Sequence, residues 1–259
     1  PFLDQLTQLG WNCIDQGLGI PKDPRKSLRT SFREVVLKEQ FFECVKAINK
    51  NPKGEEWLTE KQLQEIFNEI TEHPSKNLLE INKIIFNLLL NNTNVDKNEL
   101  TGEEFPVVKF IDFKNPENNK FTAINQFRID TPGTTKGFII PDIVLFVNGL
   151  PLVVVEAKDQ NEYTANPLHE AIKQLKRYSN QRIETHEAGL KEGEERLFHF
   201  NQLLVVTYGE DAKYGTISSS DQYFFNWKDI YHYYFHIFIR TIIFVIFAQN
   251  FGTHIKNKN

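Results

Sequence analysis

The sequence predicts an α/β domain with a mixed central sheet flanked by helices, preceded by a mainly helical N-terminal lobe. Two observations support this fold class. Apolar residues recur at helical spacing through much of the first hundred residues, and after them short apolar runs alternate with turn sequences. We therefore expect a helical lobe at 1–100, an α/β core at 101–230 and a separate tail at 231–259.

The predicted lobe contains two clear amphipathic patterns. Residues 1–54 are expected to be mainly helical around a Gly/Pro-rich loop, GLGIPKDPRKS. Residues 58–72 form the first amphipathic helix, with Thr59 as its N-cap, and residues 77–91 form the second. The apolar positions at helical spacing are Leu63, Ile66, Phe67 and Ile70 in the first helix, and Leu78, Ile81, Ile84, Ile85 and Leu88 in the second.

Strands dominate the part that follows. The predicted strands are 107–112, 121–130, 142–147, 152–157 and 203–207, separated by turn sequences such as NPENN, TPGTTKG and NGLP. Two of them, DIVLFV and LVVVEA, are joined by a four-residue Asn-Gly turn, which is the pattern of a buried hairpin. A helix is expected from Asn166 to about Glu187, with an inward stripe made of Leu168, Ala171, Ile172 and Leu175.

The overall composition narrows the class of protein. A formal net charge of −4 gives no global sign of nucleic-acid binding, so any DNA contact must depend on a local basic patch. Cys13 and Cys44 fit no zinc spacing and no disulfide framework, which indicates a reducing, cytoplasmic setting. Residues 231–251 are long enough to span a bilayer, but Arg240 at their centre favours a packed element and no membrane association.

Two carboxylates are predicted to meet at one end of the hairpin. Asp142, which follows Pro141, opens the first strand, and Glu156 closes the second. Because the two strands run antiparallel, the start of one lies beside the end of the other. Glu156 and Lys158 are two positions apart on one strand, so their side chains point to the same face.

This set of residues suits the hydrolysis of a phosphodiester. Asp142, Glu156 and the backbone carbonyl of Ala157 supply the hard oxygen ligands that Mg²⁺ prefers, for one ion or two. Lys158 would orient or deprotonate the attacking water and offset negative charge in the transition state. Gln126, on a neighbouring predicted strand, either supports a metal ligand or makes a cross-strand hydrogen bond.

The helix after the hairpin adds a second pattern. Gln174 and Tyr178 are four positions apart beside the inward stripe, and they either bind the DNA backbone or anchor the loop of the metal site. The basic residues of this helix, which suit phosphate contacts, are Lys173, Lys176 and Arg177. The plainer alternatives are a strand-capping Asp142, a solvent-facing ion pair of Glu156 with Lys158, and an amphipathic helix with a solvated basic face.

These motifs resemble the N-terminal nuclease region of type I restriction enzyme R subunits, which are relatives of the PD-(D/E)xK superfamily. The matching segments include INKIIFNLLL, PDIVLFVNGLPLVVVEAKD, AIKQLKRY and FNQLLVVTYGED, within about residues 78–228. The Gln-x-x-x-Tyr helix is shared with RecB-type nucleases. The resemblance implies a restriction-endonuclease-like core in a subunit that translocates double-stranded DNA with ATP and cuts it non-specifically, together with methyltransferase and specificity subunits.

The sequence departs from that family in lacking the phosphate-binding loop G-x-x-x-x-G-K-[ST]. We therefore expect ATP to be needed by the full-length subunit and not to be bound by this chain. Residues 231–259 are expected to lead toward a motor domain outside it. The leading hypothesis is a magnesium-dependent DNA endonuclease domain. Two alternatives are a stand-alone RecB-like nuclease that cuts without ATP or partners, and a non-catalytic docking module that keeps the nuclease fold.

Overall fold

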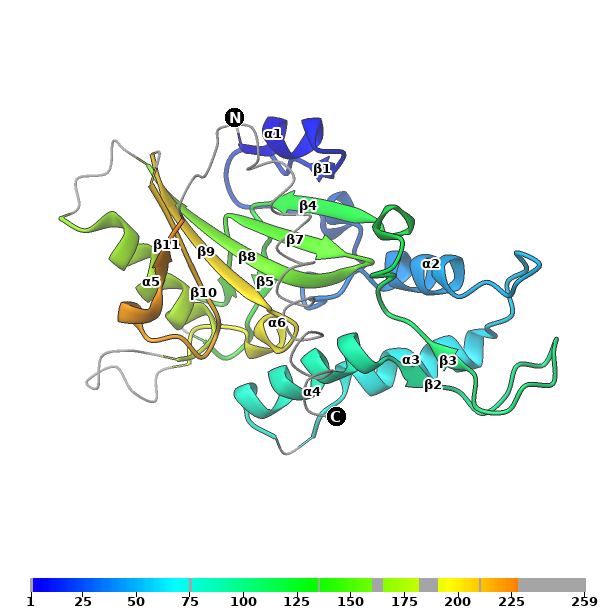
Figure 1. Ribbon diagram of the computed structural model, residues 1–259. Helices are drawn as coiled ribbons and strands as arrows, with labels where there is room; N and C mark the ends of the chain where they lie inside the picture. Colours follow the sequence, from blue (N-terminus) through cyan, green and yellow to red (C-terminus); the bar gives the residue numbers. More distant parts are fainter. Residues whose placement is uncertain are drawn as a thin grey trace, which may run out of the picture.

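A mixed seven-stranded sheet forms the centre of the computed structural model, which describes residues 2–74, 76–134, 136–159, 165–181, 191–209 and 211–227 (Figure 1). In spatial order, its strands are β1 (Asn12–Ile14), β4 (Phe121–Asn125), β7 (Ile143–Val147), β8 (Leu150–Lys158), β9 (Leu203–Tyr208), β10 (Asp211–Gly215) and β11 (Phe225–Asn226). The β1–β4 and β8–β9 pairs are parallel, and the other neighbouring pairs are antiparallel. This sheet has the mixed character that the sequence predicts.

Helices flank this sheet. Within the described residues the α-helices are α1 (Phe2–Gln8), α2 (Lys38–Ile48), α3 (Glu60–Thr71), α4 (Leu78–Asn91), α5 (Pro167–Tyr178) and α6 (Glu195–His199). The two predicted amphipathic helices are confirmed as α3 and α4, and each begins with a capping box, from Thr59 and from Asn77. Helix α5 packs against β8 and β9, and α4 packs against α6 (Figure 1). The mixed α/β class is therefore confirmed.

The hairpin of β7 and β8 occupies the middle of the sheet. Val147 pairs with Leu150, so only Asn148 and Gly149 join the two strands. Their φ angles of 50° and 82° are typical of a type I′ turn. The predicted turn of four residues is therefore wrong by two, because left-handed conformations at both positions let the strands pair right up to the turn.

The hydrophobic core extends from the hairpin into the helices. Phe41 of α2 lies with its ring centroid 6.2 Å from that of Phe110 and 5.6 Å from that of Phe67 in α3. A Cβ atom on Gly149 would lie only 2.6 Å from the carbonyl oxygen of Leu37. The backbone before α2 therefore packs directly on the turn of the hairpin, and only glycine fits at this position.

Two predicted strands are shorter than expected. The range 107–112 is a strand only at its start, because the chain turns at Asp112, whose Oδ1 accepts the backbone N–H groups of Lys114 and Asn115. The range 121–130 is broken at Gln126, whose φ of 46° is incompatible with a continuous strand. The short strands outside the main sheet are β2 (Thr93–Asn94) paired with β3 (Val107–Val108), and β5 (Ile129–Asp130) paired with β6 (Phe138–Ile139).

Other elements also differ from prediction. The helix expected to run to about Glu187 ends at Tyr178, because Asn180 turns the chain with a φ of 56°. Residues 1–54 are less helical than expected and contribute the edge strand β1. Short 3-10 helices occur at Pro24–Ser27, Pro116–Asn118 and Asp221–Tyr223.

No helix of the described part of the chain is long and apolar enough to cross a membrane. The apolar segment 231–251 lies outside the described residues. The predicted division into 1–100, 101–230 and 231–259 stays a prediction.

Candidate active site

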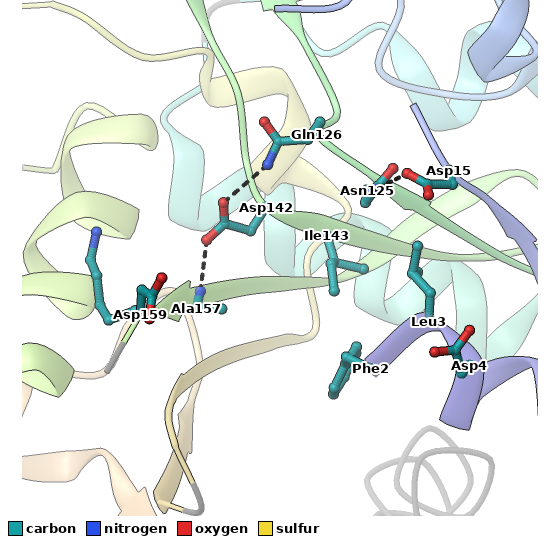
Figure 2. Close-up of a pocket in the computed structure, with 11 residues that line it drawn as sticks. Phe2, Leu3, Asp4, Asp15, Asn125, Gln126, Asp142, Ile143, Ala157 and Asp159 are labelled. Atoms are coloured by element: carbon teal, nitrogen blue, oxygen red, sulfur yellow. Dashed lines mark hydrogen bonds between the residues drawn. The ribbon is translucent and has the colours of Figure 1, made fainter. Parts of the chain in front are cut away.

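Four neighbouring strands bring polar residues to one edge of the central sheet. Strands β1, β4 and β8 end at this edge and β7 begins there, because β7 runs antiparallel to both of its neighbours. The residues at these strand ends are Asp15, Asn125, Asp142 and Glu156. Figure 2 shows the first three of them along the wall of a cleft of about 520 Å³, which the start of α1 also lines.

Asp142 is held by hydrogen bonds to both of its carboxylate oxygens (Figure 2). Its Oδ2 accepts the backbone N–H of Ala157 across the hairpin at 2.8 Å, and its Oδ1 accepts Nε2 of Gln126 at 3.4 Å. The backbone N–H of Gln126 also donates to the carbonyl of Asp142 at 2.7 Å, so the predicted cross-strand hydrogen bond is confirmed. Burial raises the pKa of Asp142, although these hydrogen bonds and Lys158 oppose the shift.

Glu156 is the most buried acidic side chain at this edge, with 1% of its surface exposed. Its Oε1 accepts a short hydrogen bond from Nε2 of Gln174. Its Oε2 has no hydrogen-bond partner among the described residues. Burial raises the pKa of Glu156 well above its usual range, the nearby Asp142 carboxylate raises it further, and Lys158 opposes both effects. The two carboxyl groups also interact directly through a side-chain hydrogen bond, so the buried oxygen of Glu156 is available either to a proton shared with Asp142 or to a group from outside the chain.

Lys158 completes the cluster. Its Nζ lies 3.7 Å from Oε1 of Glu156 and donates to Oε1 of Gln174 at 2.7 Å. Its side chain is only 15% exposed, so the ammonium group is held beside the acidic pair and not extended into solvent. The solvent-facing ion pair considered as the plainer alternative is therefore wrong, because Glu156 is buried and most of the Lys158 side chain is covered. The prediction that Glu156 and Lys158 share a face is confirmed.

Helix α5 supplies the residues that support this cluster. Gln174 contacts Glu156, Lys158 and Tyr178, donating to the Tyr178 hydroxyl from Nε2 at 2.8 Å. The Tyr178 hydroxyl donates in turn to the carbonyl of Ile140 at 3.2 Å, and burial raises its pKa. Gln174 and Tyr178 therefore tie α5 to the ends of both hairpin strands, as the anchoring alternative predicted.

The basic residues of α5 do not form a single face. Lys173 lies 3.6 Å from Glu170, and Arg177 lines a second pocket of about 200 Å³ together with Lys136. Lys176 is only 6% exposed, and its Nζ donates to the carbonyl of Ile217 at 2.8 Å. The prediction that Lys176 belongs to a basic surface is therefore wrong, because its aliphatic chain enters the core and its ammonium group bonds to the backbone.

The residues present fit a hard divalent cation. Asp142 and the backbone of Ala157 line the cleft, and the carboxylate of Glu156, with its unpartnered Oε2, is buried next to them. Among the described residues there is no cluster of three or more His, Cys, Asp and Glu side chains that could hold a metal ion. A cation at this position would therefore need oxygen ligands from the backbone, from water or from a substrate as well.

Sequence reasoning missed one part of the cleft. Asp15 and Asn125 face it from β1 and β4, and the Nδ2 of Asn125 donates to Oδ1 of Asp15 at 2.6 Å (Figure 2). The signal in the sequence is weak, because the three-residue strand before Asp15 is too short to show an alternating pattern.

The fold and the site together define a mixed α/β domain in which a half-buried aspartate, a buried glutamate and a lysine meet beside a cleft at the edge of the sheet. The chain belongs to the family of the type I restriction enzyme R protein N terminus, whose model matches residues 1–223. The resemblance noted from the sequence is therefore confirmed. The matched range includes every residue of the cluster described above.

Relatives in bacteria and archaea carry names that agree with this family. The type I restriction enzyme HindI endonuclease subunit of Haemophilus influenzae is 31% identical over 226 residues, which are 87% of this chain and 19% of that protein. The putative type I restriction enzyme MjaIXP endonuclease subunit of Methanocaldococcus jannaschii is 27% identical over 229 residues, 88% of this chain and 20% of that protein. This chain thus spans about a fifth of the length of these two relatives.

Proposed function

We propose that this chain is the DNA-cleaving domain of a type I restriction enzyme R subunit, with a magnesium-dependent PD-(D/E)xK site. The motif consists of Pro141-Asp142 and of Glu156-Ala157-Lys158. The observation that carries the proposal is the environment of Glu156, whose carboxylate is buried beside that of Asp142 and keeps one oxygen without a protein partner. A buried polar atom without a protein partner calls for an explanation, and a bound ion is one that suits an oxygen next to a second carboxylate.

Asp142 and Glu156 would hold Mg²⁺, with the carbonyl of Ala157 as a third oxygen ligand. When bound, the ion acidifies a water molecule and stabilises charge on the phosphate. The two carboxyl groups suit this role because burial has removed their hydration, which raises the pKa of each. A divalent cation restores the lost electrostatic stabilisation of the charged forms.

In its neutral form Lys158 would position the attacking water and take its proton, and the ammonium group so formed would offset negative charge as the phosphorus–oxygen bond breaks. Gln174 holds this lysine in place through its Oε1 and holds Glu156 through its Nε2. The amide of Gln174 therefore fixes the amino group of Lys158 and the carboxylate of Glu156 relative to each other. The Tyr178 hydroxyl accepts a hydrogen bond from the amide of Gln174 and so orients it. The same hydroxyl donates to the carbonyl of Ile140, which anchors the segment that leads to Asp142.

The whole protein is proposed to be larger than this chain. Its relatives are named as endonuclease subunits of type I restriction enzymes. We infer a cytoplasmic complex in which a separate motor region uses ATP to translocate double-stranded DNA, with methyltransferase and specificity subunits as partners. In this chain, Lys173 and Arg177 would contact the phosphates of the DNA that enters the cleft.

The test is plasmid cleavage by the full-length subunit with its methyltransferase and specificity partners, with and without ATP. Wild type should cut only when ATP and Mg²⁺ are present. Lys158→Ala should lower cleavage by about 10³-fold or more while ATP hydrolysis and translocation continue. Lys213→Ala, which removes a lysine from β10 outside the site, should cut like wild type.

Other outcomes would overturn the proposal. Equal cleavage by wild type and Lys158→Ala would place the nuclease elsewhere in the subunit and leave this domain as a docking module. Cleavage by wild type without ATP or partners would favour a stand-alone nuclease instead.

A further inference from the structure

A loop at the same edge of the sheet exposes apolar side chains. Residues 16–20 follow the end of β1, and Leu18 at the tip is fully exposed, while Ile20 is 52% exposed. Gly17 and Gly19 have φ angles of +75° and +89°, and no atom lies within 4 Å of the position of a Cβ on either one. These glycines therefore serve the shape of the loop and not close packing, and that shape holds Leu18 in solvent.

The base of this loop is fixed to the cleft. The backbone N–H of Gln16 donates to Oδ1 of Asn125 at 2.6 Å, and its Nε2 donates to the carbonyl of Lys26 at 2.8 Å. Oδ1 of Asp15 accepts the N–H of Gly17 at 2.8 Å and Nδ2 of Asn125 at 2.6 Å. Because Asp15 and Asn125 also line the cleft, the loop keeps a defined position relative to the candidate active site (Figure 2).

The segment around the loop is basic although the chain is acidic. Residues 16–33 contain five lysine or arginine residues and one acidic residue, whereas the formal net charge of the whole chain is −4. The exposed cations of this segment are Lys22, Arg25, Lys26 and Arg33. Arg25 forms an ion pair with Asp23 at 3.0 Å, which leaves the net charge of the surface positive. A local basic patch of this kind favours the phosphate backbone of a nucleic acid.

The position of the loop suits a duplex that reaches the cleft. Three strand spacings separate the end of β1 from the end of β8, so these ends lie roughly 14 Å apart. One turn of duplex DNA is about 34 Å long. A duplex placed across the strand ends would therefore meet both the acidic cluster and Leu18 within a single turn.

We infer that residues 16–20 form a DNA wedge, in which Leu18 enters the minor groove and presses between base steps next to the cleavage point. Lys22 and Lys26 contact the phosphates beside it. Minor-groove proteins combine apolar wedges with flanking cations in this way to unstack and bend a duplex. The inference rests on the proposed nuclease function and names how that site holds its DNA. The neighbouring positive charge favours DNA over another protein surface as the partner of Leu18.

The test uses the full-length subunit and short duplexes that carry 2-aminopurine at successive positions, because the fluorescence of this base rises when it is unstacked. Leu18→Ala should reduce the fluorescence rise on binding, and the cleavage rate, at least threefold. Leu100→Ala, which shortens another exposed leucine on the loop between β2 and β3, should change neither. Lys22→Ala and Lys26→Ala should each lower the slope of log affinity against log salt by about one.

The active-site variant separates this inference from the proposed function. Lys158→Ala should lose cleavage and keep the fluorescence rise, whereas Leu18→Ala should lose the rise. If Lys158→Ala still cuts, the nuclease proposal fails, and the fluorescence of the Leu18 variant still decides the wedge. Unchanged fluorescence and binding in Leu18→Ala overturn the wedge. A lower melting temperature of the free full-length Leu18→Ala subunit also overturns it, because Leu18 then packs against another part of the protein.

Discussion

The β7–β8 hairpin buries one polar side chain toward each of its ends, Asn148 at the turn and Glu156 at the other, but the two are satisfied to different degrees. At the turn, Asn148 is fully buried, and its Nδ2 donates to the Phe110 carbonyl at 2.9 Å and to Oδ1 of Asn119 at 2.8 Å. Its Oδ1 accepts the N–H of Lys120 at 2.8 Å. At the other end, Glu156 is 1% exposed and its Oε2 has no partner within the described parts of the chain.

This is the difference we expect between a polar residue that only stabilises the fold and one that binds a ligand. A buried amide with all its hydrogen bonds made favours one arrangement of the turn at little cost. A buried carboxylate with an unpartnered oxygen costs stability, and folding alone gives no reason to keep it. The turn end therefore serves as an internal reference for the other end, where we propose that the cost to folding is offset by ligand binding.

The largest effect on stability is expected at the turn end. In Gly149→Ala the new Cβ would lie 2.6 Å from the carbonyl oxygen of Leu37 and 2.8 Å from the backbone nitrogen of Phe41, at a φ of +82°. We expect a loss of about 3 kcal/mol or more in urea unfolding. Gly54→Ala has the same φ of +82° but no atom within 4 Å, and should lose only about 1 kcal/mol. Equal losses would show that the turn is not packed as described.

The next largest effect on stability is expected when a metal ion is added, at the Glu156 end of the hairpin. Mn²⁺ at a hundred times its dissociation constant should raise the free energy of unfolding by about 2.7 kcal/mol, because the ion binds the folded state. A thermal-shift titration would detect it. Asp142→Ala should abolish the stabilisation, and Asp211→Ala, which removes an exposed carboxylate from β10, should keep it. Stabilisation of all three proteins alike would place the metal site elsewhere.

A smaller stabilising effect is expected for Glu156→Gln without metal. Because the folded-state pKa of Glu156 is raised, the folded protein holds a proton that the unfolded chain releases above about pH 4.3. Wild-type stability therefore falls as the pH rises from there toward the folded-state pKa. The neutral glutamine lacks this penalty, so the variant should be about 1–2 kcal/mol more stable at pH 7 in EDTA, with the gain vanishing near pH 4. A less stable variant at pH 7 would contradict the described environment of Glu156.

The smallest effect should come from the support that α5 gives to the site. Tyr178→Phe removes the hydroxyl that donates to the Ile140 carbonyl and accepts from Gln174. We expect a loss of about 1 kcal/mol in urea unfolding and a several-fold fall in cleavage. Tyr223→Phe, at a 56% exposed tyrosine, is the matched control and should change neither quantity. A full loss of cleavage in Tyr178→Phe would mean that the hydroxyl itself takes part in the reaction.

The sequence predicts those features whose causes are local. The apolar runs before and after the turn identify β7 and β8, so the positions of Asp142 and Glu156 at one end of the hairpin follow from antiparallel pairing. The spacing of Gln174 and Tyr178 places both on one face of α5, where the structure brings Gln174 to Glu156 and Lys158. Their catalytic roles stay predictions.

The features that the sequence misses depend on distant parts of the chain. Strand β1 is only three residues long and exists because it pairs with β4, which follows it by more than a hundred positions. The burial of Lys176 depends on the Ile217 carbonyl, which no helical pattern can reveal. The break of the predicted strand at Gln126 likewise depends on the backbone hydrogen bond to Asp142. Short-range patterns contain no information about such partners.

The parallel pairing of β1 with β4 also sets the order in which the domain can assemble. The contact between Gln16 and Asn125 joins residues 109 positions apart. At about 5–20 residues per second, a ribosome needs roughly 5–20 s to synthesise the partner of β1 after β1 itself. During that interval Trp11, which is only 3% exposed in the folded chain, has no sheet to cover it.

Strand β1 docks beside β4, and the acidic cluster also requires β7 and β8, which follow β4 in the chain. A nascent chain released before β8 would therefore contain Asp142 but lack Glu156 and Lys158. The cleft and its acidic pair are therefore complete only once the chain has been synthesised through β8, more than a hundred positions after β1.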